Sequence, residues 1–361
     1  MSTRVWTGLL AVLLAGCGGG SGGTGSSPSS SATPSSTPLP ELIVIADYPQ
    51  SSPDTTPTLL HLVRLDGTEV NQLTLKAGAV TTTARGSRIF VVEQGGVLKA
   101  LHRDGSVEDL GNLGTTSLDG STVASPDGNT WLWGTLDTGS QGTVYAGAKG
   151  SAPRVIEQSH DPIRAVRPYS WTQRGPSVEH GALGIGGYIL FYTATGPIDL
   201  LEPVSGKVTP VNHTTDCSFS DLATNGTIAC FPHTTPHTLS LIADNGQVIT
   251  VALPADRFAR EGAAYFSPND DQLVVGGATG AGPGQEQFAT DLIKTSHGTA
   301  RPLGLDGVRP AEGPWAWLSD GSLIVYRPQF ASAASGVWLV GPSGTVTKLA
   351  GTGQPIGVLT G

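Results

Sequence analysis

The sequence is poor in methionine, aromatic residues and charged residues. Its 361 residues include one methionine, and 6% are aromatic and 14% charged. No stretch of a dozen residues repeats apolar side chains at the spacing of an amphipathic helix. The apolar run at residues 5–15 is too short to cross a bilayer as a mature helix. These absences argue against a helical bundle and against a helical span in the mature chain.

Basic residues and clustered histidines are also scarce. Twenty Lys and Arg residues stand against 29 Asp and Glu residues, which gives a formal net charge of −9. An acidic chain without a basic stripe is a poor match to nucleic acid or to anionic lipid headgroups. The eight histidines, which include His160 and His180, show no ligand spacing. We therefore expect no nucleic-acid partner, no metal and no cofactor.

The first 40 residues indicate the subcellular location of the protein. Residues 14–17 read Leu-Ala-Gly-Cys, directly after the apolar run. This motif resembles the lipobox of bacterial lipoproteins. The resemblance implies that residues 1–16 are a signal peptide and that Cys17 carries diacylglycerol, with acyl chains such as palmitate. The chain would then be anchored on the extracytoplasmic side of the cell membrane or outer membrane. The alternative is an ordinary signal peptide followed by a chance cysteine.

Residues 17–40 form a second region with its own composition. After Cys17 it consists of Gly, Ser, Thr, Ala and Pro, with one Leu and no charge. Such a segment cannot bury enough apolar surface to fold, so we interpret it as a disordered tether. The remaining residues 41–361 are numerous enough to enclose a sizeable core.

Residues 41–361 are predicted to be all-β. Short alternating segments are separated by turn residues, with 50 Gly and 26 Pro in the chain. One series of turns, many of them Asp-Gly or Asn-Gly, recurs at Gly67, Gly105, Gly150, Gly206, Gly246, Gly298 and Gly344. A second series is placed at Gly86, Gly128, Gly187, Gly226, Asp271 and Gly321. The first series repeats about every 46 residues, a period typical of a propeller blade with four antiparallel strands. This period predicts a seven-bladed β-propeller.

The two ends of this region support the same architecture. Residues 41–46, 58–65 and 69–75 are expected to be strands, but no inner strand precedes them. Residues 353–361 resemble a first strand that stops where its turn would begin. We therefore predict that the C-terminal strand completes the N-terminal blade, which closes the ring and removes exposed edges.

Three turns carry a family resemblance. They are Ser-Pro-Asp-Gly at residues 125–128, Ser-Pro-Asn-Asp at 267–270 and Leu-Ser-Asp-Gly at 318–321, preceded by Trp317. They are similar to the Trp-Ser-Pro-Asp-Gly core of TolB-like, WD-related propeller repeats. The resemblance implies a propeller over most of residues 41–361. It also implies a protein-interaction platform in a bacterial envelope, although some propellers are enzymes.

Cys217 and Cys230 are the only other cysteines. They are predicted on the two strands of one hairpin, where facing positions bring Cβ atoms to disulfide distance. In an exported protein we expect them to form a disulfide. Two buried thiols, or a metal pair with His213 or His233, are the alternatives.

Five carboxylates are predicted at the start of the inner strands, around the mouth of the central channel. Such a group would attract a cation or a Lys- or Arg-bearing segment of a partner. The alternative is that these residues are ordinary exposed loop residues. The five are Asp119, Glu179, Asp216, Glu261 and Glu312.

Three functional classes are compatible with these features. We expect a monomeric interaction or scaffold lipoprotein that docks an envelope protein or peptide. The alternatives are a metal-dependent propeller hydrolase, lyase or lactonase, and a module that binds a glycan or solute. Pairs of tryptophans at a spacing of two are expected to pack between blades, with a sugar platform as the alternative. They are Trp131 with Trp133 and Trp315 with Trp317.

Overall fold

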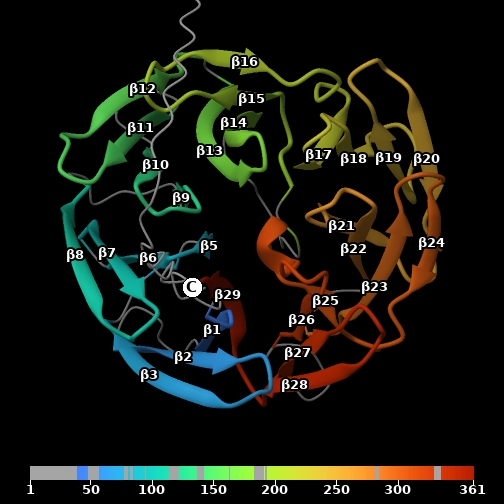
Figure 1. Cartoon of the computed structure of the whole chain (residues 1–361). Helices are drawn as coiled ribbons and strands as arrows, with labels where there is room; N and C mark the ends of the chain where they lie inside the picture. The colour runs from blue at the N-terminus through green and yellow to red at the C-terminus, as the bar shows by residue number, and fades with distance from the viewer. Residues whose placement is uncertain are drawn as a thin grey trace, which may run out of the picture. The chain divides into compact units, whose positions relative to one another are not determined.

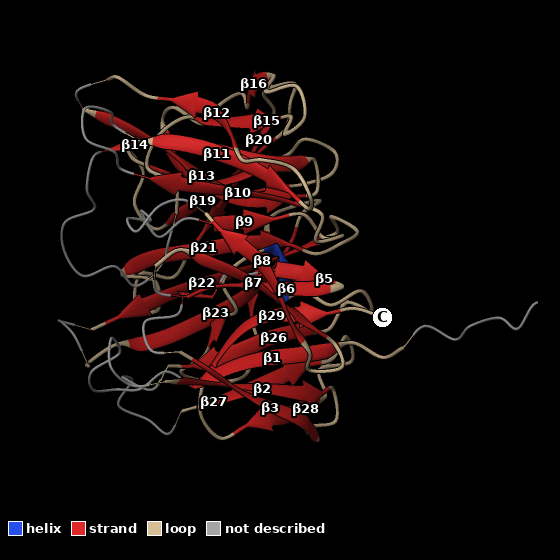
Figure 2. Ribbon diagram, turned by 90° about the vertical axis from the view of Figure 1, so that its left-hand side faces the viewer, coloured by secondary structure: helices blue, strands red, loops and turns tan. Residues whose placement is uncertain are grey.

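The chain folds as a seven-bladed β-propeller. A computed structural model describes residues 39–47, 57–76, 80–81, 84–93, 95–113, 122–135, 142–161, 163–182, 191, 193–280, 284–328 and 335–361. The described residues belong to one compact unit, Leu39–Gly361. They form seven sheets that follow one another around a common centre (Figure 1). In these residues the only helical element is the short turn η1 (Figure 2).

Blades 1 to 3 follow one plan, in which the chain moves outward from the centre in four steps. Their strands, from the centre outward, are β29 (Gln354–Leu359), β1 (Leu42–Asp47), β2 (Thr58–Arg64) and β3 (Glu69–Leu75); β4 (Val80–Thr81), β6 (Arg88–Glu93), β7 (Val97–His102) and β8 (Val107–Asn112); and β9 (Thr122–Ala124), β10 (Thr130–Thr135), β11 (Thr143–Ala148) and β12 (Arg154–Gln158). A further short strand, β5 (Ala84–Gly86), pairs in parallel with β29.

Blades 4 to 7 repeat the plan. Their strands are β13 (Arg164–Thr172), β14 (Gly175–Ala182), β15 (Ile198–Leu201) and β16 (Val208–Pro210); β17 (Cys217–Leu222), β18 (Ile228–Pro232), β19 (Thr238–Ile242) and β20 (Val248–Ala252); β21 (Arg260–Phe266), β22 (Gln272–Thr279), β23 (Gln287–Lys294) and β24 (Thr299–Pro302); and β25 (Arg309–Pro310), β26 (Leu323–Arg327), β27 (Gly336–Val340) and β28 (Val346–Ala350).

The turns between the two outer strands of each blade are those that the sequence predicts. All seven glycines of the 46-residue series have a positive φ, between 67° and 86°. Side chains other than glycine, Asn and Asp rarely adopt this conformation, so these glycines fix where each blade turns back. The turn predicted at Asp271 is formed with a positive φ of 59° at Asp270.

The C-terminal strand closes the ring, as predicted. β29 lies between β1 and β5, and its register pairs Leu42 with Leu359 and Val44 with Gly357. Its side chains Ile356, Val358 and Leu359 are at most 1% exposed. The first and last strands of the propeller are therefore neighbours in a single sheet.

Blade 4 differs from the prediction. The sequence places Glu179 at the start of an inner strand and a turn at Gly187. In the structure the inner strand is β13, and Glu179 lies on β14, the second strand of the blade. A proline at position 168 argues against a central strand, but β13 is an edge strand with a bulge between Pro168 and Ser170, where proline is tolerated. Residue 187 lies outside the described residues.

The segment around Trp315 is not a regular strand, although a spacing of two between Trp315 and Trp317 is typical of one. Pro314–Ala316 forms the 3₁₀ turn η1, preceded by Gly313 with a φ of 128°. Trp317 rejoins the sheet through an isolated bridge to Leu323. Pro314 supplies no backbone N–H, so the segment cannot continue as a regular ladder.

The tryptophan pairs pack between blades, as predicted. Trp131 and Trp133 of β10 are buried in one apolar cluster with Phe90 of the preceding blade. The Trp133 ring stacks on Tyr145 with ring centroids 5.3 Å apart. The indole N–H of Trp317 donates to the carbonyl of Tyr265 in the preceding blade, at 2.9 Å. These rings are therefore core residues and are not exposed platforms.

The cysteine prediction is confirmed. Cys217 and Cys230 form a disulfide between β17 and β18, with a Cα–Cα distance of 5.7 Å. Both residues are buried. Because disulfides persist in oxidising compartments, the bond indicates an extracytoplasmic location. The part of the chain that the structure describes contains no helix with the length and hydropathy of a membrane span.

Deletion of residues 354–361 tests ring closure. The truncated chain is expected to lose a cooperative thermal transition, because β1 becomes an exposed edge and three buried side chains are removed. Each of these contributes roughly 1.5–3 kcal/mol, and the sum approaches the whole stability of a typical domain. Removal of Gly361 alone is the control. An unchanged transition after the longer deletion would show that the ring closes in another way.

Asp221 makes the stability of the propeller depend on pH. Burial raises the pKa of this carboxyl from 3.8 to about 7, although it accepts backbone N–H groups of Phe266 and Leu222. The folded state therefore holds the proton more tightly than the unfolded chain does. Protonation of Asp221 therefore stabilises the folded state. This stabilisation is fully present below the pKa of 3.8 in the unfolded chain and is lost as the pH rises through about 7.

The Asp221→Asn variant tests this dependence in urea unfolding measured at several pH values. The amide cannot accept both N–H groups, so the variant is expected to be less stable by about 1–3 kcal/mol. Because it cannot ionise, its stability should change less than that of the wild type between pH 4 and pH 7. Asp216→Asn, at an exposed carboxyl nearby, is the control. Parallel profiles for all three proteins would contradict the assignment.

Candidate functional site

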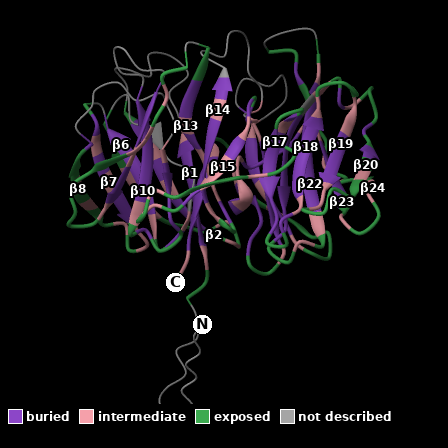
Figure 3. Cartoon of the chain, turned by 90° about the horizontal axis from the view of Figure 1, so that it is seen from above, coloured by how far each residue is buried: buried purple, intermediate pink, exposed green. Residues whose placement is uncertain are grey.

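The two faces of the propeller differ in the segments that they carry. Each blade has four antiparallel strands, so the chain returns after every blade to the face where the inner strands begin. We call this the connector face, because it holds the links from one blade to the next. The opposite face, here the terminus face, holds the start of β1 and the end of β29. Figure 3 shows the C-terminus on this side.

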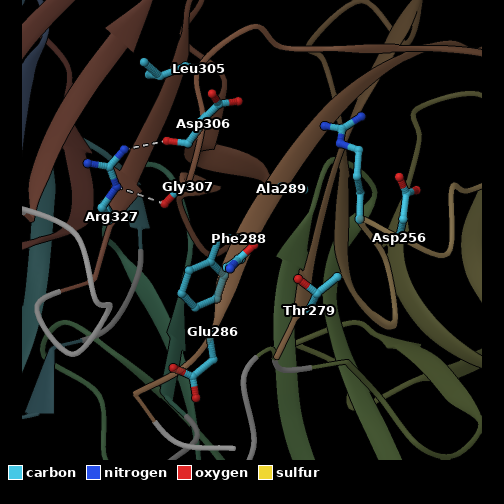
Figure 4. A pocket seen from close by; sticks show the side chains of 11 residues that line it. Asp256, Thr279, Glu286, Phe288, Ala289, Leu305, Asp306, Gly307 and Arg327 are labelled. Carbon is cyan, nitrogen blue, oxygen red and sulfur yellow. Dashed lines mark hydrogen bonds between the residues drawn. The ribbon is translucent and has the colours of Figure 1, made fainter. Parts of the chain in front are cut away.

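A pocket opens on the connector face where blade 6 meets blade 7 (Figure 4). Its volume is about 490 Å³, within the range of about 300–1,000 Å³ that is common for ligand pockets. The wall comes from the link before β21, the ends of β22 and β26, the start of β23 and the link before β25. Its side chains include Asp256, Arg257, Glu286, Phe288, Asp306 and Arg327.

The two arginines of the pocket are held by the protein itself. Arg257 forms an ion pair with the buried Asp291 at 2.6 Å. Arg327 donates to the backbone carbonyls of Asp306 and Gly307, and its guanidinium lies over the Trp338 ring. Gly307 has a φ of 68°, and a Cβ there would lie 3.0 Å from Arg327 Nε. Arg327 therefore fixes the loop that carries Asp306 at the rim.

The pocket consequently carries a net negative charge. Asp256 and Asp306 are exposed, and Glu286 adds a third carboxylate. Arg257 is compensated by Asp291, which lies outside the lining. Counting these groups together leaves four carboxylates against two guanidinium groups. The pocket thus favours a cationic group over an anionic one.

Behind the pocket, a buried arginine is enclosed by aromatic rings. Arg309 is 3% exposed and lies over Phe191 at 4.3 Å and over Phe288 and Tyr326 at 5.5 and 5.4 Å. It also donates to Glu312 at 2.5 Å. Burial raises the pKa of Tyr326 well above its usual value. Because Phe288 is shared with the pocket, this cluster supports the pocket wall.

Only three of the five carboxyl side chains predicted at the channel mouth are described. Asp119 lies outside the described residues, and Glu261 is placed on β21 without a described side chain. Asp216 is exposed just before β17, and Glu312 is paired with Arg309. Glu179 is fully buried, with Arg167 Nε at 3.1 Å and the Thr195 N–H at 2.7 Å. Thus two of the three described carboxylates are bound by arginine, and a converging acidic ring stays a prediction.

A cluster that the sequence analysis missed lies where blade 3 meets blade 4. Glu157 is on β12, His180 on β14 and Asp199 on β15, so no short spacing reveals them. His180 Nε2 lies 3.0 Å from Asp199 Oδ2 and 3.3 Å from Glu157 Oε1. A hydrogen bond that His180 donates to Asp199 raises the pKa of His180, while burial raises the pKa of Glu157. Each residue lies near the connector-face end of its strand.

Comparison with known proteins shows the fold. No family model matches the chain, and no curated protein matches it. A protein from Bacteroides uniformis that is described as a putative 6-phosphogluconolactonase is similar over 90% of this chain and 100% of its own, with 12% identity and a TM-score of 0.54.

Two further solved structures are similar over most of the chain. Oligogalacturonate lyase from Vibrio parahaemolyticus is similar over 84% of this chain and 92% of its own, with 11% identity and a TM-score of 0.52. TolB from Acinetobacter baumannii is similar over 73% of this chain and 65% of its own, with 16% identity and a TM-score of 0.45. The chain is thus a β-propeller whose structural neighbours include TolB proteins and enzymes.

Proposed function

We propose that the protein is a membrane-tethered, extracytoplasmic interaction module whose connector face binds a basic segment of an envelope protein. One observation carries this proposal: an acidic pocket opens on the face opposite the start of β1 and the end of β29. Residues 17–40 would join the propeller to a lipid on Cys17, and the folded unit begins at Leu39 on the terminus face. An anchor at that point leaves the connector face accessible.

The compartment and the reach of the tether agree with this arrangement. The Cys217–Cys230 disulfide favours an oxidising compartment. A flexible segment of this length has an end-to-end distance on the order of 25 Å. The propeller would therefore stay near the membrane and still turn its connector face towards a partner.

The pocket favours a basic side chain as the central contact. Asp256 and Asp306 present carboxylates at the rim, whereas both arginines are engaged by protein groups. A Lys or Arg side chain would pass Leu305 with its apolar stem and meet the carboxylates with its charge. Asp216 adds a further exposed carboxylate at the start of an inner strand.

Binding of a small solute is the second candidate. The observation that favours it is the volume of about 490 Å³, which suits a small molecule as well as one side chain of a peptide. The likeness to a lactonase and a lyase concerns the fold alone, so an enzyme remains the third candidate.

A photoreactive amino acid at Thr279, on the pocket wall, tests the interaction. Irradiation of intact cells is expected to yield a defined protein crosslink, and Asp256→Asn combined with Asp306→Asn should weaken it severalfold. The same amino acid at Ser343, in a turn on the terminus face, is the control and should not give this product. No protein crosslink from Thr279, or equal crosslinking in the double variant, would refute the proposal and leave the solute candidate.

The Cys17→Ala variant tests the anchor separately. The variant protein is expected to move from the membrane fraction to the soluble fraction. Without a cysteine at position 17 it carries no acyl chains to hold it on the membrane. Ser21→Ala, in the Gly- and Ser-rich segment that follows Cys17, should leave the distribution unchanged. Equal membrane association of wild type and Cys17→Ala would refute lipidation.

A further inference from the structure

The cluster of Glu157, His180 and Asp199 has the composition of a metal site. Its three ligand atoms lie within 4.8 Å of one another and come from three strands in two blades. The side chains are 19%, 28% and 16% exposed, so they are held in the fold but reachable from solvent. An imidazole with two carboxylates is a donor set that suits Zn²⁺ and related divalent ions.

The distances agree with one ion between the ligands. Tetrahedral bonds of about 2.0–2.2 Å, as zinc forms to nitrogen and oxygen, place neighbouring ligand atoms roughly 3.3–3.6 Å apart. His180 Nε2 is 3.0 and 3.3 Å from the two carboxylate oxygens. All three ligand atoms lie within 4.8 Å of one another, so adjustments of the side chains would bring them to the distances of one ion.

A second observation, at Glu157, favours a bound cation. Glu157 Oε2 is buried from solvent and has no hydrogen-bond partner in the described part of the chain. A buried carboxylate oxygen without a donor is costly, and a bound cation would satisfy it. The nearby cation that acts on His180 is Arg164, whose side chain is exposed. Among the described residues, no buried arginine or lysine balances the two carboxylates of the cluster.

Another histidine–carboxylate pair in the same chain shows the contrast. His102 Nε2 lies 3.2 Å from Glu108, but Glu108 also binds Lys149 at 2.6 Å and Arg88 at 3.5 Å. That pair is already neutralised by basic side chains and lies on the terminus face. It serves as a matched control with the same residue types and nearly the same distance.

We infer that Glu157, His180 and Asp199 bind a divalent transition-metal ion, with Zn²⁺ as the best match, and so connect blade 3 to blade 4. Three protein ligands leave one tetrahedral position for water or for a group of a bound molecule. The inference is independent of the pocket between blades 6 and 7 and goes beyond the proposed interaction function.

Calorimetric titration of the chelator-treated full chain with Zn²⁺ tests the inference. We expect one equivalent to bind and the thermal transition to rise. Glu157→Gln and His180→Gln should each weaken binding by more than the roughly 10–100-fold that second-sphere changes cost. His102→Gln should bind as the wild type does. Co²⁺ in place of Zn²⁺ should give a tetrahedral visible spectrum that the first two variants lack.

The outcomes separate the metal site from an ordinary ion-pair cluster. Absence of binding, or equal binding in wild type and in the Glu157 and His180 variants, would overturn the inference. Equal affinity for Mg²⁺ would also overturn it, because the imidazole would then contribute nothing. If His180→Gln does not fold by circular dichroism, Glu157→Gln and Asp199→Asn decide the question.

Discussion

The pairing of β29 with β1 is the constraint on which the rest of the molecule depends. The seven blades of this chain form a closed ring in which the last strand enters the first sheet, where Leu359 pairs with Leu42. This pairing places the first and last described residues on one face. It also leaves the opposite face to the links between blades. The division into a terminus face and a connector face therefore follows from ring closure.

Contacts between neighbouring blades make the ring rigid enough to carry sites. Ser220 Oγ accepts the Ala264 N–H at 2.6 Å, and Asp221 accepts the Phe266 N–H at 2.9 Å, both across a blade junction. The pocket and the Glu157 cluster also lie at such junctions. Their side chains come from separate blades, so their geometry requires the correct angle between the blades. A single isolated blade would hold neither site.

The repeated turns and strands of the fold can be predicted from the sequence. The candidate site residues, which do not recur from blade to blade, cannot. Positive-φ glycines such as Gly67 and Gly344 mark every outer turn, so the blade count follows from their spacing. Blade 4 was placed wrongly, because its first turn lacks an Asp-Gly pair and Pro168 conceals β13. The disulfide was predictable, since both cysteines fall on one hairpin. Glu157 and Asp199 were not, because the angle between blades 3 and 4 brings Glu157 to His180 and the pairing of β15 with β14 brings Asp199 there.

Charge balance distinguishes a structural cluster from a site within this one chain. A hydrogen bond from Lys149 lowers the pKa of Glu108, whereas burial raises the pKa of Glu157. The first carboxylate is satisfied by the fold, and the second is left with an unsatisfied oxygen. Glu179 belongs with the first kind, since Arg167 and Thr195 bind it in the interior. Unbalanced carboxylates near the surface of a rigid ring are costly to the fold, and such costs are concentrated at functional positions.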